Sequence, residues 1–195
     1  MGPAGGRALT AALSSGSENA PQPLGAAQTL VAAAVWGTGT QGFGRARRLR
    51  VFDGNADEVG SRLAAAVRIM GDDGAVKAYG YLHGDGRNLI RHLGPSFGTK
   101  FLYFAGYDRA CGGRRPLILD QYVALAVGRL CGVSWPATGW STRQYADHLD
   151  RAHGWASAWH TSPDVIERVL FSAGKADPLV LRAFTGLRPA GEAGR

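Results

Sequence analysis

The sequence predicts an all-α domain, and three observations lead to this fold class. Apolar residues recur at helical spacing in most segments between residues 24 and 186. Several of these segments open with helix-start signals, in which a capping side chain precedes an acid, an amide or a proline. These signals are the pairs Asn55–Glu58 and Ser141–Gln144, and Ser162 followed by Pro163. No run of alternating strands, internal repeat or linker interrupts residues 24–186, so we expect one helical domain there.

Glycines separate the helices expected in the first half of the chain. The Ala- and Val-rich stretch from Leu24 to Trp36 predicts a nearly all-buried helix that ends at Gly37, before an irregular glycine-rich run. Further helices are expected at 55–70 and 87–93, and a helix or an irregular run at 75–82. A glycine–proline hairpin at 94–98 then leads into a helix at 99–106, so the hairpin unit spans 88–106.

The second half is expected to contain a short extended segment and further helices. Residues 116–119 are extended, and Asp120 is placed to cap the helix that follows. The helices expected here cover 121–130, 141–152, 162–170 and, more briefly, 178–184. The Gly-, Ala- and Ser-rich residues 1–23 are expected to form a flexible tail without the pattern of a secretory signal, and 187–195 a frayed end.

Composition limits the partners and cofactors that the chain can take. A formal net charge of +7 over 195 residues favours a polyanionic partner. Cys111 and Cys131 form no CxxC pair, which leaves structural zinc and an iron–sulfur cluster unsupported. The five histidines follow no metal-binding spacing, and no apolar run reaches the length of a membrane span. We therefore expect no metal, no cofactor, no membrane contact and a cytoplasmic monomer.

One lysine and one aspartate form the most informative pair in the chain. Lys100 closes the segment Gly94–Lys100, and Asp120 follows twenty residues later. The chain contains three lysines, and this one stands at the start of a predicted helix, where the helix dipole and partial burial favour its uncharged, nucleophilic form. Asp120 could stabilise positive charge opposite that amine. From residue types alone, an exposed helix-start lysine and a plain N-cap aspartate remain the simpler interpretations.

Residues 88–130 resemble the core of the helix-hairpin-helix DNA glycosylase superfamily, and are most similar to the 8-oxoguanine DNA glycosylases. Those enzymes carry a Leu-Pro-Gly-Val-Gly-Thr-Lys-like hairpin, and this chain has matching residues in the segment 95–100. The matching residues are Pro95, Phe97, Gly98, Thr99 and Lys100, while Ser96 stands where a hairpin glycine usually lies. Leu119 and Asp120 match the end of the family's Pro-Val-Asp-like segment. The size implies a compact version without the N-terminal β-domain of larger members.

The resemblance implies a bifunctional base-excision repair enzyme. Lys100 would be the Schiff-base nucleophile and AP-lyase residue, Asp120 its electrostatic partner, and 8-oxoguanine in duplex DNA the substrate. Phosphate contacts are expected from the hairpin and from an arginine cluster after the glycine-rich run. These residues are Gly94, Ser96, Gly98, Thr99, Arg45, Arg47 and Arg48. Trp36 and Phe171 are the candidates for the pocket of a flipped base.

Two alternatives stay open at this stage. A helix-hairpin-helix protein that binds DNA without catalysis would explain Ser96 in the hairpin. A glycosylase for another lesion, such as an alkylated base, is disfavoured by Lys100, because superfamily members without lyase activity generally lack that lysine. An enzyme acting on chromosomal DNA would be associated with the bacterial nucleoid.

Overall fold

The computed structural model describes residues 22–38, 50–84, 86, 88–109 and 111–176, and all regular structure within them is helical. The helices are α2 (Pro23–Thr38), the 3₁₀ turn η1 (Arg50–Phe52), α4 (Ala56–Asp73), α5 (Ala75–His83), α6 (Pro95–Gly106), α7 (Gln121–Cys131), α8 (Thr142–Ala158) and α9 (Pro163–Lys175). The all-α prediction is confirmed.

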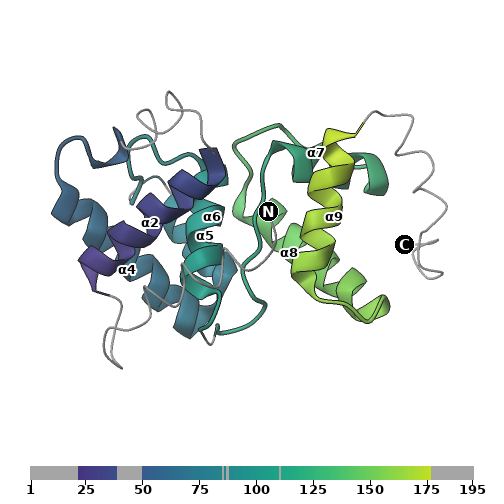
Figure 1. Cartoon of the computed structure of the whole chain (residues 1–195), viewed down its shortest axis with the longest axis horizontal. Helices are drawn as coiled ribbons and strands as arrows, with labels where there is room; N and C mark the ends of the chain where they lie inside the picture. The colour runs from purple at the N-terminus through teal and green to yellow at the C-terminus, as the bar shows by residue number, and fades with distance from the viewer. Residues whose placement is uncertain (1–21, 39–49, 85, 87, 110, 177–195) are drawn as a thin grey trace.

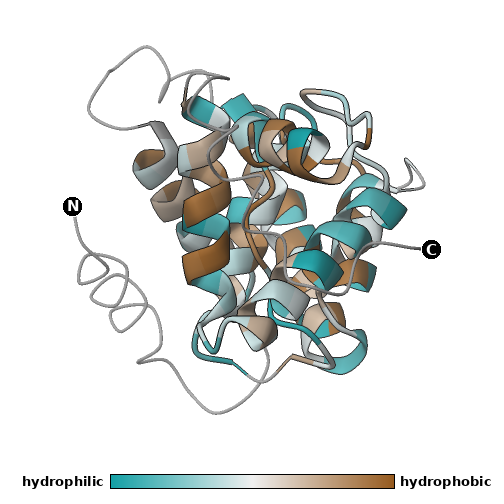
Figure 2. Ribbon diagram, turned by 90° about the vertical axis from the view of Figure 1, so that its right-hand side faces the viewer, coloured by the Kyte–Doolittle hydropathy of each residue, from teal (hydrophilic) through white to brown (hydrophobic). Residues whose placement is uncertain are grey.

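The helices form two groups that lie side by side (Figure 1). The first group holds α2, α4, α5 and α6, and the second holds α7, α8 and α9. Helix α5 packs against α8 and joins the two groups. Buried residues from both groups form one continuous hydrophobic cluster, and hydrophilic residues gather on the outer faces (Figure 2).

Most helix starts follow the signals in the sequence. Asn55 caps α4 by accepting a hydrogen bond from the Glu58 N–H at 3.1 Å, although the Glu58 carboxylate turns away to Arg62. Ser141 and Gln144 form the full reciprocal capping box of α8. Proline occupies the first turn of α9, as expected from its fixed φ and missing N–H.

The predicted helix at 87–93 is wrong. Residues 88–94 form turns, and His92 has a left-handed φ of 67°. Helix α6 begins at Pro95, four residues earlier than expected, because proline suits a first helical turn and keeps Gly94 extended (ψ 157°). Lys100 therefore lies in the second turn of α6 and not the first, so little of its environment comes from the helix N-terminus.

Helix α2 also departs from the prediction. It continues through Gly37 to Thr38, and it is not buried all round. Leu24 is 71% exposed and Trp36 is 53% exposed, because only one side of the helix packs against α4 and α6. Helix α2 is therefore only partly buried, although most of its residues are apolar.

Several predicted features lie outside the described residues: the glycine-rich run beyond Thr38, the helix at 178–184, residues 1–21 of the first tail and the whole of the second. The predicted tail at 1–23 is wrong at its end, because Pro23 already belongs to α2. Among the helices that are described, none has both the length and the apolar character required to cross a membrane.

The extended segment Leu117–Leu119 is buried without a neighbouring strand. Its backbone groups bond to side chains instead. Tyr145 Oη donates to the Leu117 carbonyl at 3.1 Å, and His148 Nε2 lies 3.1 Å from the Ile118 carbonyl. Thr99 Oγ1 lies 3.0 Å from the Leu119 carbonyl and 3.1 Å from the Leu119 N–H. These contacts from α6 and α8 satisfy polar groups that would otherwise destabilise the fold, and they fix the residue that follows, Asp120.

We predict that Thr99→Val destabilises the protein by about 2 kcal/mol or more, because the isosteric side chain leaves the buried Leu119 N–H and C=O unpaired. Urea denaturation followed by circular dichroism measures this change. Thr99→Ser keeps the hydroxyl and is the matched control. Equal stability of the valine variant and wild type would contradict the role assigned to Thr99.

We also predict that His148 makes the protein sensitive to acid. Burial lowers the pKa of His148 to about 4 from 6.5, so the unfolded chain binds a proton first as the pH falls. Its stabilising contribution is complete above pH 6.5 and is lost as the pH falls towards 4. Between pH 7 and pH 5, wild type should lose about 2 kcal/mol relative to His148→Gln. Parallel urea titrations of the two proteins at both pH values test this, and an unchanged difference would contradict it.

Candidate active site

Lys100 and Asp120 lie against each other where the two helix groups meet. Lys100 comes from α6, and Asp120 ends the extended segment before α7. Lys100 Nζ is 3.8 Å from Asp120 Oδ2, and the two side chains are only 8% and 12% exposed. The simpler interpretation of Lys100 as an exposed helix-start lysine is therefore wrong.

The two oxygens of Asp120 have separate tasks. Oδ1 accepts the backbone N–H groups of Tyr122 and Val123, at 2.9 and 3.1 Å, and so caps α7. Oδ2 faces the lysine. The N-cap role is confirmed, and it holds the carboxylate at a fixed orientation while leaving one oxygen for the site.

Three residues surround the lysine. Ser96 Oγ, one turn earlier on α6, accepts a hydrogen bond from Nζ at 3.0 Å. Nζ also lies 5.3 Å from the centre of the Phe97 ring, within the range of a cation–π contact. Gly37 of α2 packs on the aliphatic stem, since a Cβ there would lie 3.0 Å from Lys100 Cδ. The amine is thus held at the end of a tightly enclosed stem.

A second carboxyl reaches the same place from α9. Glu167 Oε2 accepts the Ile118 N–H at 2.6 Å, two residues before Asp120. Burial raises the pKa of Glu167 to about 8; Asp164 and Asp120 add to the rise, and the Ile118 hydrogen bond and Lys100 oppose it. Burial, together with Asp164 one turn earlier on α9, raises the pKa of the Tyr103 phenol on α6. Glu167 therefore ties α9 to the extended segment that ends at Asp120.

Aromatic side chains stand on both sides of the pair. Trp36, next to Gly37, contacts Phe104 edge-on with ring centres 5.3 Å apart. Phe171, one turn beyond Glu167, contacts Tyr122 edge-on at 5.5 Å. Trp36 therefore lies against α6, the helix that carries Lys100, and Phe171 lies against α7, the helix that Asp120 caps.

The expected phosphate contacts are only partly compatible with the structure. Thr99 is fully buried in its contact with Leu119, and Gly98 is buried against His83, so neither presents a group to a ligand. The Ser96 hydroxyl is engaged by Lys100. Gly94 remains half-buried as the N-cap of α6. The arginines of the cluster, Arg45, Arg47 and Arg48, lie outside the described residues.

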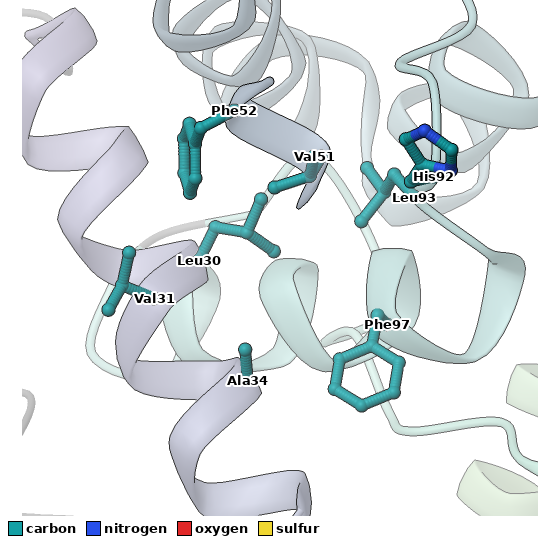
Figure 3. A pocket seen from close by; sticks show the side chains of 8 residues that line it. All are labelled: Leu30, Val31, Ala34, Val51, Phe52, His92, Leu93 and Phe97. Atoms are coloured by element: carbon teal, nitrogen blue, oxygen red, sulfur yellow. The ribbon is translucent and has the colours of Figure 1, made fainter. Parts of the chain in front are cut away.

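An apolar pocket lies beside this site but is separate from it (Figure 3). Its lining residues are Leu30, Val31, Ala34, Val51, Phe52, His92, Leu93 and Phe97. The cavity of about 10 Å³ has room for about one water molecule and none for a purine. Within the described part of the chain, no cluster of His, Cys, Asp or Glu could hold a metal ion.

Sequence reasoning missed Glu167, Ser96 as a lysine partner, and Gly37 as the cover of the stem. The i, i+4 spacing of Ser96 and Lys100 on one helix could have indicated that the two side chains meet. Glu167 lies four residues before Phe171, on the same face of α9, which could have indicated an acid beside the aromatic. No pattern in the sequence indicates that Gly37 packs against the side chain of Lys100.

Comparison with known proteins gives one match. The model of a family described as "Putative 8-oxoguanine DNA glycosylase OGG-like protein" matches residues 8–171. No curated protein and no solved structure matches the chain.

We predict that Lys100 and Asp120 are energetically coupled. A double-mutant cycle with Lys100→Gln and Asp120→Asn should give a coupling energy of about 1–3 kcal/mol in urea denaturation, because both groups are buried. The exposed pair Arg62–Glu58, cycled with Arg62→Gln and Glu58→Gln, is the control and should give about 0.5 kcal/mol. If the coupling energy of Lys100 and Asp120 is no larger than that of Arg62 and Glu58, the buried contact between Lys100 and Asp120 is contradicted.

Proposed function

We propose that this chain, which belongs to the OGG-like family of 8-oxoguanine DNA glycosylases, is a bifunctional glycosylase with AP-lyase activity on double-stranded DNA. Lys100 is the nucleophile, Asp120 its electrostatic partner, and an oxidised purine the base released, with 8-oxoguanine first among the lesions to test. The single observation that carries this proposal is the buried approach of Lys100 Nζ to Asp120 Oδ2.

The pair supplies what a lyase-type glycosylase needs. The lysine amine attacks C1′ of the deoxyribose, the C1′–N bond breaks, and the base leaves with the bonding electrons and takes up a proton. As that bond breaks, positive charge develops at the sugar, and the fixed carboxylate of Asp120 stabilises it. The C1′–O4′ bond then breaks, O4′ takes up the remaining amine proton, and an imine forms between C1′ and Lys100. Loss of a proton from C2′ then expels the 3′ phosphate with the electrons of its bond to C3′.

The surroundings of the pair suit a base turned out of the helix. A flipped nucleotide needs aromatic faces beside the reacting carbon, and we propose that Trp36 of α2 and Phe171 of α9 supply them. The backbone at Gly94 and the arginines at 45, 47 and 48 are proposed to hold phosphates. The net charge of +7 supports such contacts and predicts affinity that falls with salt.

We predict that borohydride traps a covalent complex between the protein and a duplex that contains 8-oxoguanine, because reduction converts the imine on Lys100 to a stable amine. Denaturing gel electrophoresis with labelled DNA measures this adduct. Lys100→Gln should give none, and Asp120→Asn should lower base release by about 100-fold or more, the usual loss for a fixed electrostatic group.

The control is Lys77→Gln, an exposed lysine on α5 that should leave trapping intact. A panel of other oxidised and alkylated bases defines the lesion. DNA binding that survives Lys100→Gln, with no adduct and no base release from any lesion in wild type, would contradict the proposal and favour a binding protein without catalysis.

A further inference from the structure

Two oxygens near the amine of Lys100 differ in distance and in charge. Ser96 Oγ accepts a hydrogen bond from Nζ at 3.0 Å, whereas Asp120 Oδ2 lies at 3.8 Å, beyond hydrogen-bonding distance. An ammonium that meets a carboxylate directly forms a bond of about 2.8 Å, roughly twice as strong as a neutral one. The amine is therefore held by the oxygen that attracts an ammonium less.

The stem of Lys100 is fixed, and its end is not fixed to the same degree. A Cβ at Gly37 would lie 3.0 Å from Lys100 Cδ and 3.2 Å from Cε, so α2 packs closely on this part of the stem. Rotation about the Cδ–Cε bond still carries Nζ along a short arc. A shift of about 1 Å would bring Nζ into hydrogen-bonding distance of Asp120 Oδ2. The hydroxyl of Ser96 opposes that shift.

Ser96 is itself held in place by the residue that anchors the extended segment. Thr99 Oγ1 lies 3.0 Å from the Ser96 carbonyl and 3.0 Å from the Leu119 carbonyl, next to Asp120. Gly94 is the N-cap of α6, so the Ser96 hydroxyl does not serve as the cap of the helix. One buried hydroxyl thus fixes the spacing between the backbone that holds the amine and the backbone that carries the carboxylate.

We propose that Ser96 is a positioning residue whose hydroxyl holds the amine of Lys100 away from Asp120 and so keeps the ion pair from closing. The inference rests on the proposed function for its role in base release but not for its first test. Direct contact with Asp120 would stabilise the ammonium form of Lys100, and a protonated amine cannot attack C1′. Held by Ser96, the amine gives up its proton more readily.

This role accounts for the residue at which the chain departs from the hairpin of the enzymes that it resembles. A serine at that place is a reason to consider a protein without catalysis when the sequence is taken alone. Its contact with the lysine gives the serine a task in the reaction instead. Ser96 in the hairpin is then compatible with an active enzyme.

The reactivity of Lys100 can be measured without DNA. Brief reductive methylation with formaldehyde and cyanoborohydride, followed by mass spectrometry of peptides, gives the labelling rate of each lysine between about pH 6.5 and 9.5. The exposed Lys77 is the internal reference. In Ser96→Ala the amine turns to Asp120, so we expect the Lys100-to-Lys77 ratio at pH 8 to fall about threefold to tenfold below wild type, since one pKa unit is a factor of ten.

The charged groups that face the lysine are the same in wild type and in Ser96→Ala. They are Asp120 before α7 and Glu167 on α9, whose pKa Lys100 lowers, while α2 contributes the uncharged Gly37. In an Asp120→Asn background the carboxylate is absent, so Ser96→Ala should not lower the ratio further. A fall of equal size in both backgrounds, or no fall in Ser96→Ala alone, would overturn the proposal.

Matched variants separate the hydroxyl from the fold. Ser96→Thr keeps the hydroxyl and should label as wild type does, and Ser61→Ala makes the same change at an exposed site on α4 and should have no effect. Alanine favours helices, so Ser96→Ala should fold, which circular dichroism checks. Ser96→Cys, whose sulfur is a weak acceptor, should lower the ratio as well and serves if the alanine variant does not fold.

Borohydride trapping on a duplex that contains 8-oxoguanine extends the test to the reaction. At saturating DNA and pH 8, Ser96→Ala should trap about threefold to tenfold more slowly than wild type, approach it at higher pH, and bind DNA equally well. Weaker DNA binding with an unchanged rate at saturation would indicate that the hydroxyl binds a phosphate, and would overturn the proposal. If no lesion gives base release but the labelling ratio falls as expected, the proposed function fails while this inference stands.

Discussion

The site depends on a stretch of backbone that is buried in extended form without a strand beside it. Such a segment is unstable unless each N–H and C=O finds a partner. Here the partners are side chains: Tyr145 and His148 from α8, Thr99 from α6 and Glu167 from α9. Because these side chains reach from both helix groups, the segment Leu117–Leu119 is the point at which the two groups are locked together. Asp120 comes directly after it, so its position is set by the whole fold.

This arrangement explains why a carboxylate can be kept close to a lysine in the interior. A buried ion pair alone contributes little to stability, since desolvation offsets attraction. Asp120 is held instead by its cap on α7, and Lys100 by the packing of its stem against Gly37 and by the Ser96 hydroxyl. The distance of 3.8 Å between them is thus a consequence of the surrounding structure. A pair held in this way need not close to ideal contact.

Sequence reasoning reached the fold class and most helix starts, and it singled out Lys100 and Asp120, which the structure brings within 3.8 Å of each other. It succeeded where local chemistry decides the structure, as at the capping box of Ser141 and at the N-cap Asp120. It failed at 88–94, where an apolar period predicted a helix but the chain turns through His92 and restarts at Pro95. It also missed Glu167 and Gly37, because their roles depend on how α9 and α2 lie against α6. Contacts between helices that are far apart in the sequence produce no residue spacing from which they could be predicted.

The distribution of charge fits the reaction proposed for this family member. The chain as a whole is basic, with a net charge of +7, as binding to phosphates requires. The lysine at the site nevertheless lies 3.8 Å from a carboxylate, that of Asp120. A site lined with further cations would attract the backbone more strongly but would oppose the positive charge that develops at C1′ as the base departs. A basic chain in which one carboxylate is held against the lysine meets both demands, and the buried segment that precedes Asp120 keeps that carboxylate in place.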